Sequence, residues 1–100
     1  MKRMIEGKSY NTETAEEVCD IPCQYYGNDF RHHNTKLYIT RNGTFFLAGK
    51  GGAASVWGER IANELRAGEG IRVLSQSEAR AYMEQADCDE EDYKRVGLET

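Results

Sequence analysis

The sequence has no excess of basic residues. Its 13 lysines and arginines are outnumbered by 17 aspartates and glutamates, which gives a formal net charge of −4. Proteins that bind duplex nucleic acid usually carry a basic excess, because they must neutralise phosphates. The composition therefore argues against nucleic acid as a direct partner and mildly favours a partner protein with a basic surface.

The sequence also lacks the features of an exported or membrane-bound chain. Two basic residues stand in the segment 1–7, but no apolar stretch follows them, so we expect neither a signal peptide nor a membrane span there. The three cysteines are an odd number, which free thiols in a reducing compartment explain most simply. We therefore expect a cytoplasmic protein that makes no contact with a membrane.

The length and composition are those of a small globular protein. A chain of 100 residues has room for one modest hydrophobic core. Hydrophobic residues at 39% and charged residues at 30% are ordinary values for such a protein. We expect a single domain spanning residues 1–100.

The segment 37–48 is the clearest structural signal in the chain. It is rich in β-branched and aromatic residues, which favour strands. Asn42-Gly43 in its middle can supply the two positive φ angles of a tight type I′ turn. The segment therefore predicts a β-hairpin in which Ile39 lies opposite Phe46.

Four segments carry helical spacing of apolar residues or helix-capping residues. The second is the clearest, because Trp57, Ile61 and Leu65 repeat at intervals of four. The third begins with a capping box formed by Ser75 and Glu78. The four segments are 12–21, 53–67, 75–86 and 89–96.

Short extended segments are expected beside the hairpin at 2–5, 8–10 and 71–74. Combined with the four helical segments, they predict an α+β fold. In this fold a central antiparallel β-hairpin sheet is packed by three to four helices.

The segment 20–34 has no periodicity and reads as a long ordered loop, a feature that is often functional. Its aromatic residues Tyr25 and Tyr26 could anchor a protein interface or stack on nucleic-acid bases. Without basic residues around them, the protein interface is the better interpretation. Phe30 in the same loop is expected to close the core over the hairpin.

Carboxylates crowd the segment 84–92. Such a run usually forms a solvated face, but it can also mimic phosphates or dock on an arginine-rich protein surface. The residues are Glu84, Asp87, Asp89, Glu90, Glu91 and Asp92. We predict that they contribute to the binding of a partner protein.

Two cysteines and two histidines have the right chemistry for a zinc site or a thiol-dependent enzyme. They are Cys19, Cys23, His32 and His33. Their spacing is poor, because Pro22 lies between the cysteines and adjacent histidines point apart in an extended segment. We therefore expect no metal, no cofactor and no catalytic residue, with a small zinc- or thiol-dependent enzyme as the alternative.

The glycine-rich segment 49–52 follows the hairpin and contains one lysine. Free N–H groups at a helix start could bind an anion beside that lysine. The segment nevertheless matches neither the P-loop nor the dinucleotide-binding pattern. It is more typical of a tight connection in which backbones approach closely.

Several phrases of the sequence resemble a widespread group of short, uncharacterised bacterial proteins from phages and integrated mobile elements. These phrases are the segments 7–15, 37–40, 45–47 with Gly43 before them, 51–53, and 74–75 leading into 78–79. The resemblance implies a small α+β domain encoded by accessory genes, where phage-defence antagonists such as anti-CRISPR proteins are found. It implies no catalytic residues.

The sequence thus predicts a non-enzymatic protein that binds and occludes a partner protein. An inhibitor of a host nucleic-acid-handling complex is the concrete form of this hypothesis. A nucleic-acid-binding regulator that uses the hairpin is a further alternative.

Overall fold

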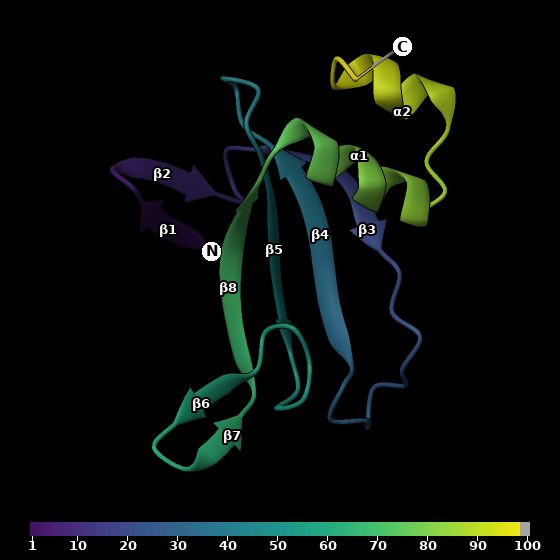
Figure 1. The fold of residues 1–100 in the computed structure, drawn as a ribbon. Helices are drawn as coiled ribbons and strands as arrows, with labels where there is room; N and C mark the ends of the chain where they lie inside the picture. The colour runs from purple at the N-terminus through teal and green to yellow at the C-terminus, as the bar shows by residue number, and fades with distance from the viewer. Residues whose placement is uncertain (99–100) are drawn as a thin grey trace.

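Residues 1–98 are described by a computed structural model, and within this range β-strands are the main regular structure (Figure 1). The strands are β1 (Lys2–Ile5), β2 (Lys8–Asn11), β3 (Glu16–Ile21), β4 (His33–Ile39), β5 (Phe45–Gly51), β6 (Glu59–Ile61), β7 (Glu64–Arg66) and β8 (Gly68–Leu74). The helices are α1 (Gln76–Gln85) and α2 (Glu90–Arg95). Among these residues, no helix is long and apolar enough to cross a bilayer.

The predicted α+β fold with three to four packing helices is wrong. The strands form three antiparallel sheets, and residues 1–98 contain only two short helices, of 10 and 6 residues. The main sheet has the strand order β3-β4-β5-β8, while β1-β2 and β6-β7 are separate two-stranded sheets. Helix α1 lies across one face of the main sheet, where it contacts β3, β5 and β8 (Figure 1).

Strand β5 is buried on both of its faces, so it divides the core into two clusters. On one face, Phe45 and Leu47 pack with Met83 of α1. On the other, the ring of Phe46 meets that of Tyr10 edge to face, with centroids 5.5 Å apart. Burying each of these large side chains contributes roughly 1.5–3 kcal/mol to stability.

The predicted hairpin is present as β4 and β5, but its register differs from the prediction by one residue. Ile39 pairs with Phe45 rather than with Phe46. The turn spans the three residues 41–43, of which only Gly43 has a positive φ, +86°. This is the glycine-bulge form of a hairpin turn. Because side chains alternate along a strand, the shift changes which residues of the two strands share a face.

The predicted helix at 12–21 is wrong, because this segment contains strand β3. A β-bulge between Glu17 and Cys19 interrupts the pairing of β3 with β4. The bulge adds Val18 to the strand, so the side chains of Val18 and Ile21 are both buried although they are three residues apart. This spacing imitates one face of a helix.

The predicted helix at 53–67 is also wrong. Its four-residue apolar repeat does not mark a buried face, because Ile61 and Leu65 are exposed on the small hairpin β6-β7. Ala62 occupies the tight turn of that hairpin with φ +56°. The residue that follows the segment 53–67, Gly68, is the first residue of β8.

The two C-terminal helices are confirmed. The amide of Ser75 donates to Glu78 Oε1 over 3.0 Å and the amide of Glu78 donates to Ser75 Oγ over 3.2 Å, which is a complete capping box. Asp89 caps α2 by accepting from the amide of Asp92 over 3.1 Å. Strands β1, β2 and β8 likewise occupy the segments predicted to be extended.

A substitution at Gly43 tests the turn. We expect Gly43→Val to lower the free energy of unfolding by about 1–3 kcal/mol, because a β-branched residue resists positive φ. Gly27→Val is the matched control, since its φ is not in the positive range and an added Cβ meets nothing within 4 Å. Urea unfolding of both variants measures the difference, and equal stabilities would contradict the turn assignment.

Candidate functional site

The loop between β3 and β4 is held in shape by three side chains. Arg31 forms a two-pronged ion pair with Asp29, with Nε 3.0 Å from Oδ1 and Nη2 2.8 Å from Oδ2. The guanidinium also lies 4.1 Å from the ring centroid of Tyr25. The hydrogen bonds from Arg31 lower the pKa of Asp29 to about 2, so the pair stays charged at neutral pH.

Two other aromatic side chains of this loop point to solvent. Tyr26 is 86% exposed and Phe30 is 76% exposed. The prediction that Phe30 closes the core is therefore wrong. The backbone of Phe30, rather than its ring, contacts the neighbouring loop. Its carbonyl accepts from the amide of Ala54 over 2.9 Å, and a Cβ on Gly52 would lie within 2.4 Å of the same carbonyl oxygen.

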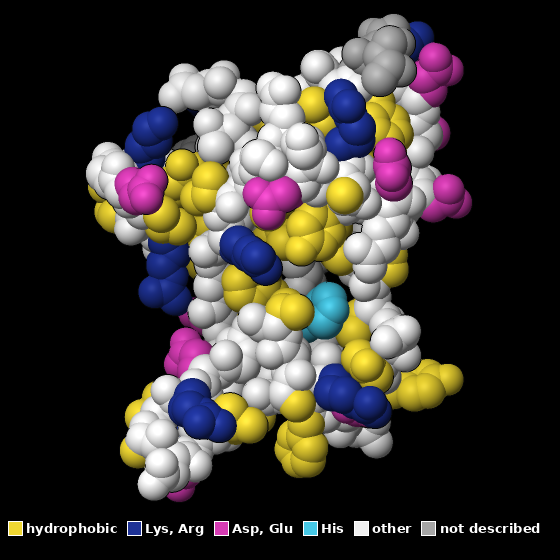
Figure 2. All heavy atoms as spheres, in the orientation of Figure 1, with side chains coloured by type: hydrophobic (Ala, Val, Ile, Leu, Met, Phe, Trp, Pro, Cys, Tyr) yellow, Lys and Arg dark blue, Asp and Glu magenta, His cyan; other side chains and the backbone are white. Residues whose placement is uncertain are grey.

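Further exposed hydrophobic side chains lie at this end of the molecule. Val56 belongs to the loop that pairs with the loop of Phe30, while Ile61 and Leu65 sit on the adjoining hairpin β6-β7. Figure 1 places these segments together at the end of the main sheet opposite to α2, and Figure 2 shows hydrophobic side chains there. We call this surface the apolar end; it consists of Tyr26, Phe30, Val56, Ile61 and Leu65.

The structure does not bring the two predicted parts of the partner-binding site together. Tyr25 and Tyr26 lie in the loop at the apolar end, whereas the predicted carboxylates lie on and around α1 and α2 at the other end (Figure 1). Two of the carboxylates have structural roles: Asp89 caps α2, and Asp92 lies 3.4 Å from Arg95 in an ion pair. The remaining four, Glu84, Asp87, Glu90 and Glu91, are exposed.

Trp57 packs on the main sheet at a point where two glycines leave space for its indole. A Cβ on Gly49 would lie 2.5 Å from Trp57 Nε1, and a Cβ on Gly70 would lie 3.5 Å from the indole ring. Nε1 donates to Oγ1 of the buried Thr35 over 2.7 Å. Trp57 thus packs on the sheet as predicted, but from a loop rather than a helix.

Thr35 links Trp57 to a histidine. Nδ1 of His33 lies 2.8 Å from Thr35 Oγ1. This oxygen accepts from the indole, and its hydroxyl proton can be donated to Nδ1; with that donation the ring proton of neutral His33 is on Nε2. Burial, and secondly the neighbouring His32, lower the pKa of His33, so the neutral ring is favoured at neutral pH.

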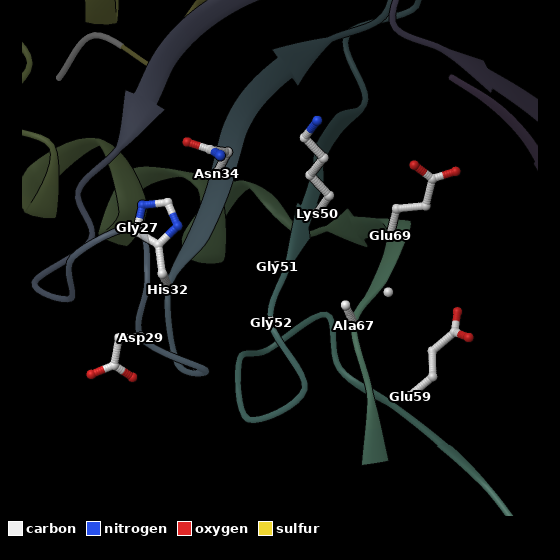
Figure 3. Close-up of a pocket in the computed structure, with 11 residues that line it drawn as sticks. Gly27, Asp29, His32, Asn34, Lys50, Gly51, Gly52, Glu59, Ala67 and Glu69 are labelled. Carbon is white, nitrogen blue, oxygen red and sulfur yellow. The ribbon is translucent and has the colours of Figure 1, made fainter. Parts of the chain in front are cut away.

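The glycine-rich segment 49–52 borders a wide, open hollow of about 550 Å³ (Figure 3). Lys50 lines this hollow together with carboxylates, including Asp29 of the loop between β3 and β4 and Glu69 of β8. This mixture of charges does not favour an anion site. The predicted close backbone approach is present, because a Cβ on Gly51 would lie within 2.3 Å of Ser55 Oγ.

The four residues considered for zinc or thiol chemistry do not form a site. Burial, and secondly a hydrogen bond with Cys88, raise the pKa of the Cys19 thiol to about 12, so it is a poor nucleophile. Cys23 Sγ lies 3.8 Å from the carbonyl oxygen of Tyr25, while His33 is bonded to Thr35. Among residues 1–98, no three His, Cys, Asp or Glu side chains are placed to hold a metal ion.

Comparison with protein families, curated proteins and solved structures gave no match for this chain.

Sequence reasoning missed the exposed side chains of Phe30, Val56, Ile61 and Leu65 and the contact between Trp57 and Thr35. One signal could have indicated that contact. Gly49 and Gly51 stand two apart in a strand, so they leave the C-terminal half of one face of β5 without side chains, which favours close approach by another segment.

Substitutions of Gly49 and Gly70 test the packing of Trp57 on the sheet. Gly49→Ala places a Cβ against Trp57 Nε1 and the carbonyl of Asn34, both at 2.5 Å, so we expect a loss of about 1–3 kcal/mol in unfolding free energy. Gly70→Ala makes only an ordinary contact and should stay within about 0.5 kcal/mol of the parent. Chemical denaturation followed by the fluorescence of the single tryptophan measures both changes. Equal losses in the two variants would show that the indole is not fixed here.

The lowered pKa of His33 predicts a pH dependence of stability. Between the unfolded pKa, about 6.5, and the lower folded pKa, the unfolded chain binds the proton more readily, so acidification through this window should lower the melting temperature. We expect His33→Gln to flatten this part of the curve. His32→Gln should retain it, because burial is the larger cause of the shift. Identical curves for wild type and His33→Gln between about pH 7.5 and 5.5 would contradict the prediction.

Proposed function

We propose that the protein acts in the cytoplasm without catalysis, by binding a partner protein at its apolar end and covering part of the partner's surface. The observation that carries this proposal is that five of the six exposed large hydrophobic side chains within residues 1–98, all but Met4, belong to segments at one end of the molecule (Figure 1). Such patches on small soluble domains mark interaction sites more often than scattered apolar residues do. Aromatic residues are also enriched among the anchors of protein interfaces.

The order of the loop supports the same proposal. Asp29, Arg31 and Tyr25 hold the loop in one conformation, and the hydrogen bond from Ala54 to Phe30 fixes it against the neighbouring loop. A surface that is already ordered loses less conformational entropy on binding. The backbone that carries Tyr26 and Phe30 is thus already shaped for contact with a partner.

The acidic residues at the opposite end support a basic partner. The exposed carboxylates of Glu84, Asp87, Glu90 and Glu91 and the net charge of −4 attract a basic surface from a distance. Proteins that handle nucleic acids have such surfaces. Inhibition of a nucleic-acid-handling complex, the role suggested by the resemblance to mobile-element proteins, is the specific form of this proposal. Cys19, Cys23 and Cys88 are free thiols, as is typical of a reducing compartment.

Substitution of the two aromatic anchors tests the proposal. We expect immobilised wild-type protein to capture a partner from host lysate, and Tyr26→Ser/Phe30→Ser to weaken its binding by about 100-fold or more, since anchors of this kind contribute about 2 kcal/mol each. Met4→Ser is the control, because Met4 is 64% exposed but lies on β1, away from the apolar end. Calorimetry with the captured partner gives the affinities, and thermal melting should be unchanged in both variants.

Two results would overturn the proposal. The first is equal capture by the wild type and the double variant. The second is a concentration-dependent dimer of the wild type that dissociates in the double variant, because a second copy would then cover the apolar end. Reversing Glu84, Glu90 and Glu91 to lysine should slow association without abolishing it, and it leaves the cap residue Asp89 intact.

A further inference from the structure

A hollow of about 270 Å³ lies on the α1 face of the main sheet, between α1 and the loop that carries Trp57. Ile21, Leu47 and Val56 give it apolar walls. Figure 2 shows this face, with a histidine and hydrophobic side chains around a recess below the helices. Ordinary ligand pockets measure about 300–1,000 Å³. The hollow therefore suits a small ligand.

One wall of the hollow is fixed before any ligand arrives. Trp57 and His33 both contact Oγ1 of Thr35, at 2.7 and 2.8 Å, and Thr35 is only 5% exposed. Gly49 allows the indole to lie close to the sheet, where the hydrogen bond to Thr35 orients it. An aromatic wall held in this way can stack against an apolar ligand without an ordering cost.

The polar groups around the hollow are mainly hydrogen-bond donors. Arg72 of β8, the imidazole of His33 and the amide of Gln85 line it, and within residues 1–98 no carboxylate does. Arg72 makes no ion pair within residues 1–98. Hydrogen bonds with Ser75 are the main reason that the pKa of Glu78 is lowered, and Arg72 is the smallest contribution. The charges of Glu78 and Arg72 thus interact, but the two side chains form no ion pair, so the guanidinium remains available to an anion.

We propose that this hollow binds a small carboxylic acid with an apolar body, such as an aromatic or branched aliphatic acid. The body lies against Trp57 and Leu47, and the carboxylate is bound by Arg72 with a second hydrogen bond from His33 Nε2. Arginine suits this role because its guanidinium binds a carboxylate through two parallel N–H groups. The hollow shares Val56 with the apolar end, but the anchors Tyr26 and Phe30 do not line it, so the ligand would bind beside the proposed partner-binding surface.

Titration with 3-phenylpropionate tests the proposal on the whole protein. We expect saturable binding that changes the fluorescence of Trp57, the single tryptophan. The neutral amide, 3-phenylpropionamide, has the same body and should bind at least about tenfold more weakly, because it cannot form charge-assisted hydrogen bonds. No saturation up to about 10 mM acid, or equal binding of acid and amide, would overturn the proposal.

A matched pair of arginine variants identifies the carboxylate ligand. Arg72→Gln should weaken binding of the acid about tenfold or more, while Arg80→Gln should leave it unchanged. Both arginines are exposed and Arg80, on α1, does not line the hollow. Equal melting temperatures of the two variants show that the fold is intact. Equal affinities in the two variants would overturn the assignment.

A peptide ligand distinguishes between two sources of the carboxylate, a small free acid and the C-terminus of a protein. The tripeptide Gly-Gly-Phe with a free carboxyl end should bind no better than 3-phenylpropionate. If it binds more than about tenfold more tightly, the ligand is a protein C-terminus and the proposal of a small acid is wrong. This experiment is independent of partner capture at the apolar end, because Arg72→Gln leaves Tyr26 and Phe30 unchanged.

Discussion

Strand β5 has to be covered on both faces, and the arrangement of the other elements follows from this constraint. Its residues 45–49 are all buried, so neither face can be left to solvent. On one face α1 supplies Ala79 and Met83, and on the other the β1-β2 hairpin supplies Tyr10. The large side chains of β5 stand at the end of the strand where these two elements lie. The layers packed on the sheet are therefore thickest at the end where α1 and the β1-β2 hairpin lie.

The opposite half of β5 is built from small residues, and this changes what can pack there. Gly49 and Gly51 carry no side chains on the α1 face, so loops approach the sheet with their backbones and with the indole of Trp57. The loops at 22–32 and 52–58 are joined by two hydrogen bonds, from the amides of Gly52 and Ala54 to the carbonyls of His32 and Phe30. Their larger side chains, including Phe30 and Val56, are left outside. The apolar end and the hollow beside Trp57 thus have the same origin, because Gly49 and Gly51 leave this part of β5 without large side chains.

Local signals in the sequence were reliable where the structure depends on neighbouring residues. The capping box of Ser75 and Glu78 needs only a helix start, and the positive φ of Gly43 needs only a turn. The signals failed where distant contacts decide. The bulge at Val18 exists because β3 pairs with β4, and it gave a strand the spacing of a helix. Trp57 is held by Thr35, 22 residues earlier in the chain, so its four-residue spacing from Ile61 carried no information about packing.

By itself the sequence determined the strands of the central hairpin, the ends of both helices and the acidic character of the protein, because these depend on composition or on residues a few positions apart. Only the tertiary structure decided which aromatic side chains are buried and which are offered to solvent. Phe46 and Phe30 have the same side chain, yet one is fully buried and the other is 76% exposed. The difference arises because Phe46 stands in a strand covered on both faces, whereas Phe30 lies in a loop whose backbone, not its ring, packs against Gly52. Competition of this kind between segments distant in the chain is settled only when they meet in the fold.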